Sequence, residues 1–193
     1  MRVLALVLIL ICFAHFSCYK FADVFIFISN WPCFTSMGHL LLTMKLSQDK
    51  HAEKQHFQLI FAHFLFTFTL VASLIVVPIY WSVIHDKALR HFEGNTCRTN
   101  NLYFVHIFPL ISLLLNWFVT DIRLYKEQWK TFIPVWVIYS TINCIATVQR
   151  GVPLYWFLDW KDLKSPLICL TVMIVFSAVF YFIAIMSHHC KPF

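Results

Sequence analysis

The chain alternates long apolar segments with short polar ones, and residues 100–121 show this pattern most clearly. The segment reads NNLYFVHIFPLISLLLNWFVTD, and a single histidine, His106, lies within its apolar first half. About 20 apolar residues are enough to cross a hydrocarbon core roughly 30 Å thick. An ionisable group is costly at that depth and usually faces the interior of a helix bundle or a wet cavity. We therefore expect a membrane helix here, packed among others that give His106 a partner.

Further segments share this character, and together they predict an all-α fold. We expect one polytopic membrane helical bundle covering residues 1–193, with about six transmembrane helices. The second segment is the most polar, which suits a helix buried against others, where small residues allow close approach and hydroxyls bond across helices. The first imitates a cleaved signal peptide, but it has no clean small-x-small site before Lys20, which favours a retained span. The predicted spans are residues 3–19, 31–46, 58–84, 101–120, 132–149 and 166–186.

The composition supports a membrane protein and excludes other classes. Of the 193 residues, 60% are hydrophobic and only 12% are charged, whereas a soluble domain has about 25% charged residues. The net charge is +6, but the basic residues form no continuous block. We therefore expect lipid and not nucleic acid as a partner. We expect an integral, multi-pass protein of the endomembrane system (endoplasmic reticulum) or of the plasma membrane. Lys and Arg divide almost evenly between the two sides, so the positive-inside rule fixes no orientation. The oligomeric state is also not fixed by the sequence.

The cysteines and histidines indicate no metal or cofactor. Seven cysteines are an odd count and none forms a CxxC pair, so neither a disulfide framework nor a zinc site is indicated. His188, His189 and Cys190 could hold a metal, but a frayed polar tail explains them more simply. His39 and His106 are the pair that would hold a haem between two spans, although their spacing does not require one.

A hydroxyl near His106 would allow acid–base chemistry, because a Thr or Ser hydroxyl is inert without a base to take its proton. Thr35 and Ser36 lie near one end of the second span, and His106 lies near one end of the fourth. Spans two apart cross in the same direction, so these residues fall at comparable depth. The alternative is that Thr35 bonds a carbonyl of its own helix and that His106 only joins two helices. No Ser-His-Asp arrangement or G-x-S-x-G motif accompanies them.

Short motifs along nearly the whole chain resemble those of one known family. Tyr139 is followed by Gly151 and then by YWFLD at residues 155–159, with Trp156 at the place of a proline. Trp31 and Thr35 form a Trp-x-x-x-Thr motif at the start of the second span, after a first span that ends in Tyr-Lys. These motifs, with a histidine in the fourth span, resemble the androgen-induced-gene and androgen-dependent TFPI-regulating protein family of multi-span membrane proteins.

The resemblance implies a six-span intramembrane hydrolase that cleaves fatty-acid esters of hydroxy fatty acids with a threonine and a histidine. Carried over to this sequence, it makes Thr35 the nucleophile and His106 the base that activates it. The family tends to carry a carboxylate about three turns after its histidine, where this chain has Asn116. Pro109 also follows His106 more closely than the corresponding proline does. If the carboxylate orients the imidazole, these departures predict weaker activity.

Two hypotheses follow from these residues. The first is a lipid-ester hydrolase without metal or organic cofactor, whose substrate enters from the bilayer; Ser36 or Asn101 would then be candidate donors to the developing oxyanion. The second is a non-catalytic multi-span membrane protein that binds lipid or a partner protein, in which the polar residues of the second span serve packing alone. Unchanged ester turnover after Thr35→Ala or His106→Ala would select the second hypothesis.

Overall fold

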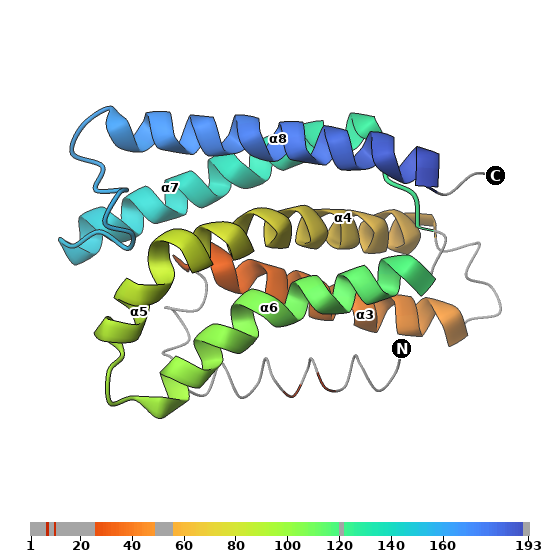
Figure 1. Ribbon diagram of the computed structural model, residues 1–193. Helices are drawn as coiled ribbons and strands as arrows, with labels where there is room; N and C mark the ends of the chain where they lie inside the picture. Colours follow the sequence, from red (N-terminus) through yellow and green to blue (C-terminus); the bar gives the residue numbers. More distant parts are fainter. Residues whose placement is uncertain (1–6, 8–9, 11–25, 49–55, 120–121, 191–193) are drawn as a thin grey trace. The chain divides into compact units, whose positions relative to one another are not determined.

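The structure, a computed structural model, describes residues 7, 10, 26–48, 56–119 and 122–190, and over this part of the chain the fold is all-α (Figure 1). The predicted fold class is therefore confirmed. The first predicted span, residues 3–19, lies almost entirely outside the described residues. The α-helices are α3 (Trp31–Gln48), α4 (His56–Ile79), α5 (His85–His91), α6 (Thr96–Val119), α7 (Phe132–Arg150) and α8 (Lys164–Cys190).

Four helical stretches in the described part of the chain are long and apolar enough to cross a membrane, which is compatible with an integral membrane protein. Helix α3, at the second predicted span, is not among them. Its hydroxyl, histidine and glycine residues lower its hydropathy, as the sequence indicated, so the number of six spans stays a prediction. The four stretches are His56–His91, Thr96–Phe118, Lys126–Arg150 and Lys164–Ser187.

The chain forms two compact units, and the first includes Ser29–Ile122, of which residues 29–48, 56–119 and 122 are described. In this unit α4 packs against both α3 and α6, and α3 also contacts α6. Gly38 lies where α3 meets α4, and a Cβ atom at this position would lie 3.3 Å from Cδ1 of Leu65. A small residue therefore lets the two helices approach closely, as is common between membrane helices.

A π-helical turn, Tyr80–Ile84 (η3), follows α4 and leads into α5. Pro78 comes just before it within α4, and proline removes a backbone donor and crowds the preceding turn of a helix. The carbonyl of Pro78 accepts a hydrogen bond from the hydroxyl of Ser82 at 2.6 Å. The wide turn ends where the N–H of His85 donates to the carbonyl of Tyr80, five residues earlier. Such turns occur frequently at functional sites.

The second unit consists of Ile26–Ile28 and Arg123–Phe193 and contains α7 and α8. Phe132, at the start of α7, is fully buried, and its ring meets those of Phe176 and Phe180 on α8 edge to face, with centroids 5.2 and 5.1 Å away. This geometry is one that aromatic rings prefer. The aromatic cluster therefore joins α7 to α8.

Helix α7 ends at Gly151, which has φ of 68° and donates its N–H to the carbonyl of Thr147 at 3.0 Å. Glycine adopts this left-handed conformation without steric cost and commonly ends helices. Earlier in α7, the buried side chain of Asn143 donates to the hydroxyl of Tyr139 at 3.2 Å and accepts the indole N–H of Trp160 at 2.7 Å. Tyr139 and Gly151, from the motif that resembles the family, thus have structural roles in this chain.

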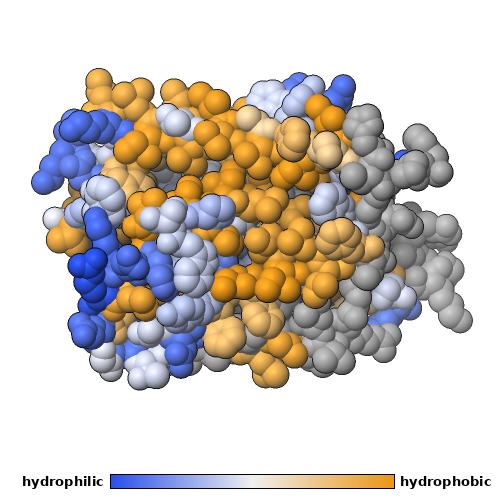
Figure 2. Space-filling model, in the orientation of Figure 1, coloured by the Kyte–Doolittle hydropathy of each residue, from blue (hydrophilic) through white to orange (hydrophobic). Residues whose placement is uncertain are grey.

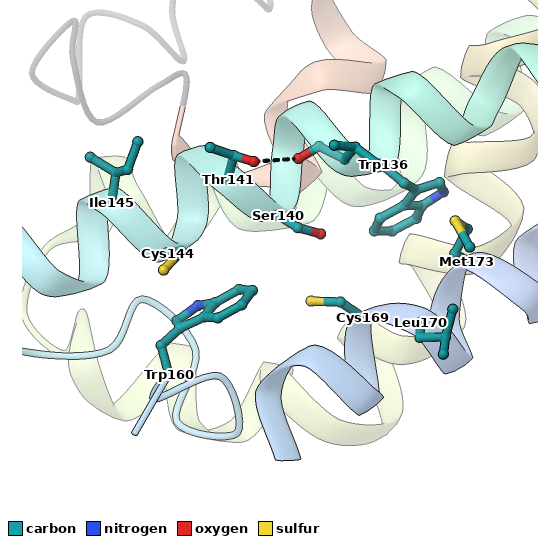
Figure 3. A pocket seen from close by; sticks show the side chains of 10 residues that line it. Trp136, Ser140, Thr141, Cys144, Ile145, Trp160, Cys169, Leu170 and Met173 are labelled. Atoms are coloured by element: carbon teal, nitrogen blue, oxygen red, sulfur yellow. Dashed lines mark hydrogen bonds between the residues drawn. The ribbon is translucent and has the colours of Figure 1, made fainter. Parts of the chain in front are cut away.

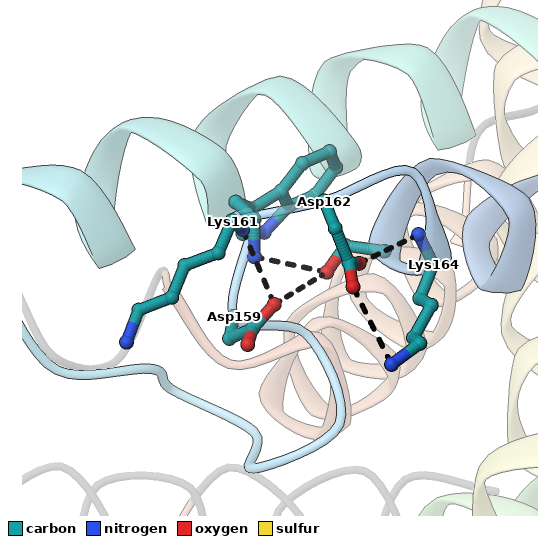
Figure 4. Close-up of polar contacts among 6 residues, drawn as sticks. Asp159, Lys161, Asp162 and Lys164 are labelled. Atoms are coloured by element: carbon teal, nitrogen blue, oxygen red, sulfur yellow. Dashed lines mark hydrogen bonds and ion pairs between the residues drawn. The ribbon is translucent and has the colours of Figure 1, made fainter.

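The loop before α8 is held by two carboxylates of its own (Figure 4). Asp159 accepts the backbone N–H of Lys161 at 3.2 Å and the hydroxyl of Ser165 at 3.4 Å. Asp162 accepts the backbone N–H of Lys164 at 2.8 Å, which satisfies a donor at the start of α8 in the manner of an N-cap. The ion pair between Asp162 and the ammonium of Lys164, at 3.4 Å, is solvent-exposed and adds little stability.

Hydrophobic side chains make up most of the middle of the surface in this view, and hydrophilic ones gather mainly at its left (Figure 2). Helix α8 contributes many of the exposed hydrophobic residues, among them Leu167, Leu170, Ile174, Val175 and Phe182. A soluble monomer rarely exposes so much contiguous apolar surface, whereas lipid covers it at no cost. The surface therefore agrees with a membrane environment.

Candidate functional site

Thr35, the predicted nucleophile, lies on α3 and is half-buried. Its hydroxyl donates to the carbonyl of Trp31 at 2.9 Å, one turn earlier on the same helix. The hydroxyl of Thr69 on α4 is fully buried and donates to Thr35 Oγ1 at 2.5 Å. Thr69 also lies 2.7 Å from the carbonyl of Leu65. The Thr35 hydroxyl thus belongs to a hydrogen-bonded chain that joins α3 to α4.

His106, the predicted base, lies on α6 and is 5% exposed. Its Nδ1 lies 2.7 Å from the carbonyl of Leu102, one turn earlier. Because a carbonyl only accepts, Nδ1 must carry the proton. In the neutral imidazole the lone pair is then on Nε2, which is the nitrogen able to take a proton from a nucleophile.

Thr35 and His106 lie at similar levels on adjacent helices, but the side chain of Thr35 does not face the helix that carries His106. The thiol of Cys33 on α3 contacts the carbonyl of Val105 on α6 at 3.8 Å, which sets this level. Two residues advance a helix by about 200°, so Thr35 points away from the side that Cys33 presents to α6. Among the described residues its hydroxyl bonds Trp31 and Thr69, and the predicted pair with His106 stays a prediction. Catalytic hydrogen bonds often form only when substrate binds.

An aromatic cluster that the sequence did not predict contacts His106 through Tyr80. The ring of Tyr80, from the π-helical turn, is stacked on the imidazole with centroids 3.4 Å apart and an interplanar angle of 8°. The hydroxyl of Tyr80 is hydrogen-bonded to Nδ1 of His85 at 3.1 Å, and the rings of Trp81 and Tyr103 border His85. The aromatic and histidine residues at 80–85, just after Pro78, could have indicated this cluster from the sequence. The π turn that sets the direction of their side chains has no sequence signature.

His39 joins three helices of the first unit. Its Nδ1 donates to the carbonyl of Ala62 on α4 at 2.9 Å, and its Nε2 accepts the side-chain amide of Asn116 on α6 at 2.9 Å. Both nitrogens are therefore engaged, and binding a haem through His39 would break one of these bonds. Asn116 comes ten residues after His106, which is about 15 Å along a helix. The residue at the place of the family's carboxylate thus contacts His39 and is too distant to orient His106.

The two candidate oxyanion donors are buried and have partners. Ser36 donates to the carbonyl of Cys33 at 2.9 Å, and the amide of Asn101 donates to the sulfur of Cys97 at 3.8 Å. Cys97, at the start of α6, is disulfide-bonded. The odd cysteine count and the missing CxxC pair did not indicate this bond.

A separate cavity of about 450 Å³ lies within the second unit, between α7 and α8 (Figure 3). Its walls are mainly apolar, and the thiols of Cys144 and Cys169 lie on opposite helices that border it. Neither Thr35 nor His106 lines it. The other lining residues include Trp136, Ser140, Trp160 and Met173.

Comparisons with known proteins leave the resemblance as an expectation. No family model matches the chain, and neither a curated protein nor a solved structure matches it.

Proposed function

We propose that the chain is a multi-pass membrane protein of the androgen-induced-gene and androgen-dependent TFPI-regulating protein family, and that it hydrolyses fatty-acid esters of hydroxy fatty acids. Thr35 is the nucleophile and His106 the base. The observation that supports this best is the placement of a threonine hydroxyl and a buried imidazole at one level of two adjacent helices. Buried ionisable groups in membrane helices usually serve a function.

The reaction requires Thr35 to leave the carbonyl of Trp31. A change of its χ1 rotamer turns the hydroxyl away from that carbonyl, and a rotation of α3 about its axis must bring Oγ1 toward α6. Oγ1 attacks the ester carbonyl carbon while Nε2 of His106 takes the hydroxyl proton, and His106 then returns this proton to the oxygen of the leaving hydroxy fatty acid. Water, activated by the same imidazole, hydrolyses the acyl-threonine and releases the fatty acid.

The disulfide at Cys97 suggests an orientation for this site. Disulfides persist in oxidising compartments such as the lumen of the endoplasmic reticulum or the cell exterior. The start of α6, and with it the end of the bundle that holds His106, then faces that compartment in an endomembrane or in the plasma membrane. A membrane-impermeant thiol reagent should label Cys97 only after reduction and only from that side.

Five variants test the catalytic proposal in detergent or liposomes with a branched fatty-acid ester. Thr35→Ala and His106→Ala should each lower kcat at least about 1,000-fold, and the double variant should lose little more, because a nucleophile and its base act as one unit. Thr35→Ser keeps the hydroxyl and should retain activity. Thr43→Ala is the matched control, since Thr43 is also half-buried on α3 and bonds a carbonyl of its own helix at 2.8 Å. Full activity of Thr35→Ala would refute the proposal.

A non-catalytic membrane protein that binds lipid or a partner protein is the second candidate. The observation that favours it is the set of bonds made by Thr35, which satisfy its hydroxyl in the same way as packing threonines elsewhere in the chain. On this reading Thr35→Val, which keeps the shape of the side chain, lowers stability and changes no chemical activity.

A further inference from the structure

The stacked pair of Tyr80 and His106 is an unusual contact for two neutral rings. Both side chains are buried, at 2% and 5% exposure, and their planes are nearly parallel with centroids 3.4 Å apart. Neutral aromatic rings prefer offset or edge-to-face arrangements over a face-to-face stack. A cation above the face of an aromatic ring is favoured, because the π electrons of the face are negative. The geometry therefore suits a protonated imidazole better than a neutral one.

Tyr80 is held in this position from two directions. The π-helical turn that begins at Tyr80 sets its backbone. Its hydroxyl is hydrogen-bonded to His85 at 3.1 Å, and its ring meets that of Trp81 edge to face with centroids 5.5 Å apart. The face presented to His106 is therefore fixed before any reaction takes place.

A hydrolase that uses histidine as a base needs a group that stabilises the imidazolium formed during attack. In serine hydrolases a buried carboxylate does this. Here the residue at the place of the family's carboxylate, Asn116, bonds His39, about 15 Å along α6 from His106. The carbonyl of Leu102 bonds Nδ1 of His106, and the ring of Tyr80 covers one face of the imidazole with chemistry that suits a cation.

We propose that Tyr80 is a positioning residue whose ring face stabilises the imidazolium of His106 and fixes the direction of Nε2. The proposal rests on the hydrolase function proposed above and names the group that supports its base. No bond to Tyr80 forms or breaks: the proton passes from Thr35 Oγ1 to His106 Nε2 and then to the leaving oxygen. The ring contributes in the protonated state of His106.

Ring fluorination tests this contribution without changing the packing. Phenylalanine at position 80 should keep kcat within about threefold, because it retains the π face. Adding one, two and three fluorines to that ring withdraws the negative charge in steps, so log kcat should fall steadily along the series while KM stays constant. Tyr80→Leu should lower kcat about thirtyfold, the value of a desolvated cation–π contact.

Tyr103→Leu is the matched control, because Tyr103 lies one turn before His106, contacts His85 and Trp81, and is 38% exposed. It should leave kcat unchanged. A flat fluorination series would show that Tyr80 only fills space and would overturn the proposal, whether or not Tyr80→Leu folds.

His106→Ala separates this proposal from the one on which it rests. Loss of turnover in His106→Ala with a flat fluorination series overturns the role of Tyr80 alone. Full turnover in His106→Ala, or none in the unmodified protein, overturns the hydrolase function and the role of Tyr80 with it. A ring-current shift of the His106 proton resonances that persists in Tyr80→Phe and disappears in Tyr80→Leu would show the stack itself.

Discussion

The two units of the chain differ in the burial of their helices and in the polar side chains that pack between them. In the first unit half of the most apolar window of α4 is buried, and the buried residues include Thr67, Thr69 and Ser73. In the second unit only 17% of the corresponding window of α8 is buried, and its exposed residues are mostly large and apolar. Helices in the first unit are therefore joined by specific hydrogen bonds, whereas α8 mainly presents exposed apolar side chains. Function that depends on placed polar groups is expected in the first unit.

The largest effect should come from the hydrogen bonds of His39. His39→Leu keeps a similar volume but leaves the carbonyl of Ala62 and the amide of Asn116 without this partner, which should cost about 3 kcal/mol of unfolding free energy. Reversible unfolding in detergent, followed by circular dichroism, measures the loss. His63→Leu on α4 is the matched control, because the contact of the His63 ring with Thr67 is long, at 3.5 Å. An equal loss in both variants would contradict the special role of His39.

A smaller effect is expected where α3 meets α4. Gly38→Val places a branched side chain against Leu65 and should cost about 2 kcal/mol, because overpacking forces helices apart or side chains off their rotamers. Unchanged unfolding in the same assay would mean that α3 and α4 are less tightly packed than the 3.3 Å approach implies.

Gly151→Ala probes the second unit through its backbone. At φ of 68° an alanine is strained, so the variant should lose about 1 kcal/mol. Gly151→Asn should lose less, since asparagine tolerates the left-handed region. If alanine and asparagine cost the same, the end of α7 adopts another conformation in the membrane.

The smallest effect is expected on the outer face of α8. Ile174 is 58% exposed, and lipid tails are as apolar as the side chain that they contact. Ile174→Ala should therefore change the unfolding free energy by less than about 0.5 kcal/mol. A loss comparable to that of His39→Leu would show that this face is buried by a second chain, and the contrast between the two units would disappear.

The fold class followed from the sequence because runs of about 20 apolar residues permit few structures other than membrane helices. Helix α7 contains the span predicted at 132–149, and α8 contains that predicted at 166–186. The contacts of the candidate site were harder to predict from the sequence. Thr35 faces Thr69, and Asn116 faces His39, because each helix is rotated about its own axis in one particular way. The hydrophobic pattern predicts this rotation poorly when nearly every side of a helix is apolar.

The π-helical turn at Tyr80–Ile84 has a consequence for comparing this chain with relatives. A turn of this kind holds one more residue than an α-helical turn, so it corresponds to a single inserted residue. Deleting one residue there would restore regular winding but rotate everything before it by about 100° relative to α5, separating Tyr80 from His85. Homologues that lack the insertion should therefore align only with a one-residue gap, and they should support their histidine by other means.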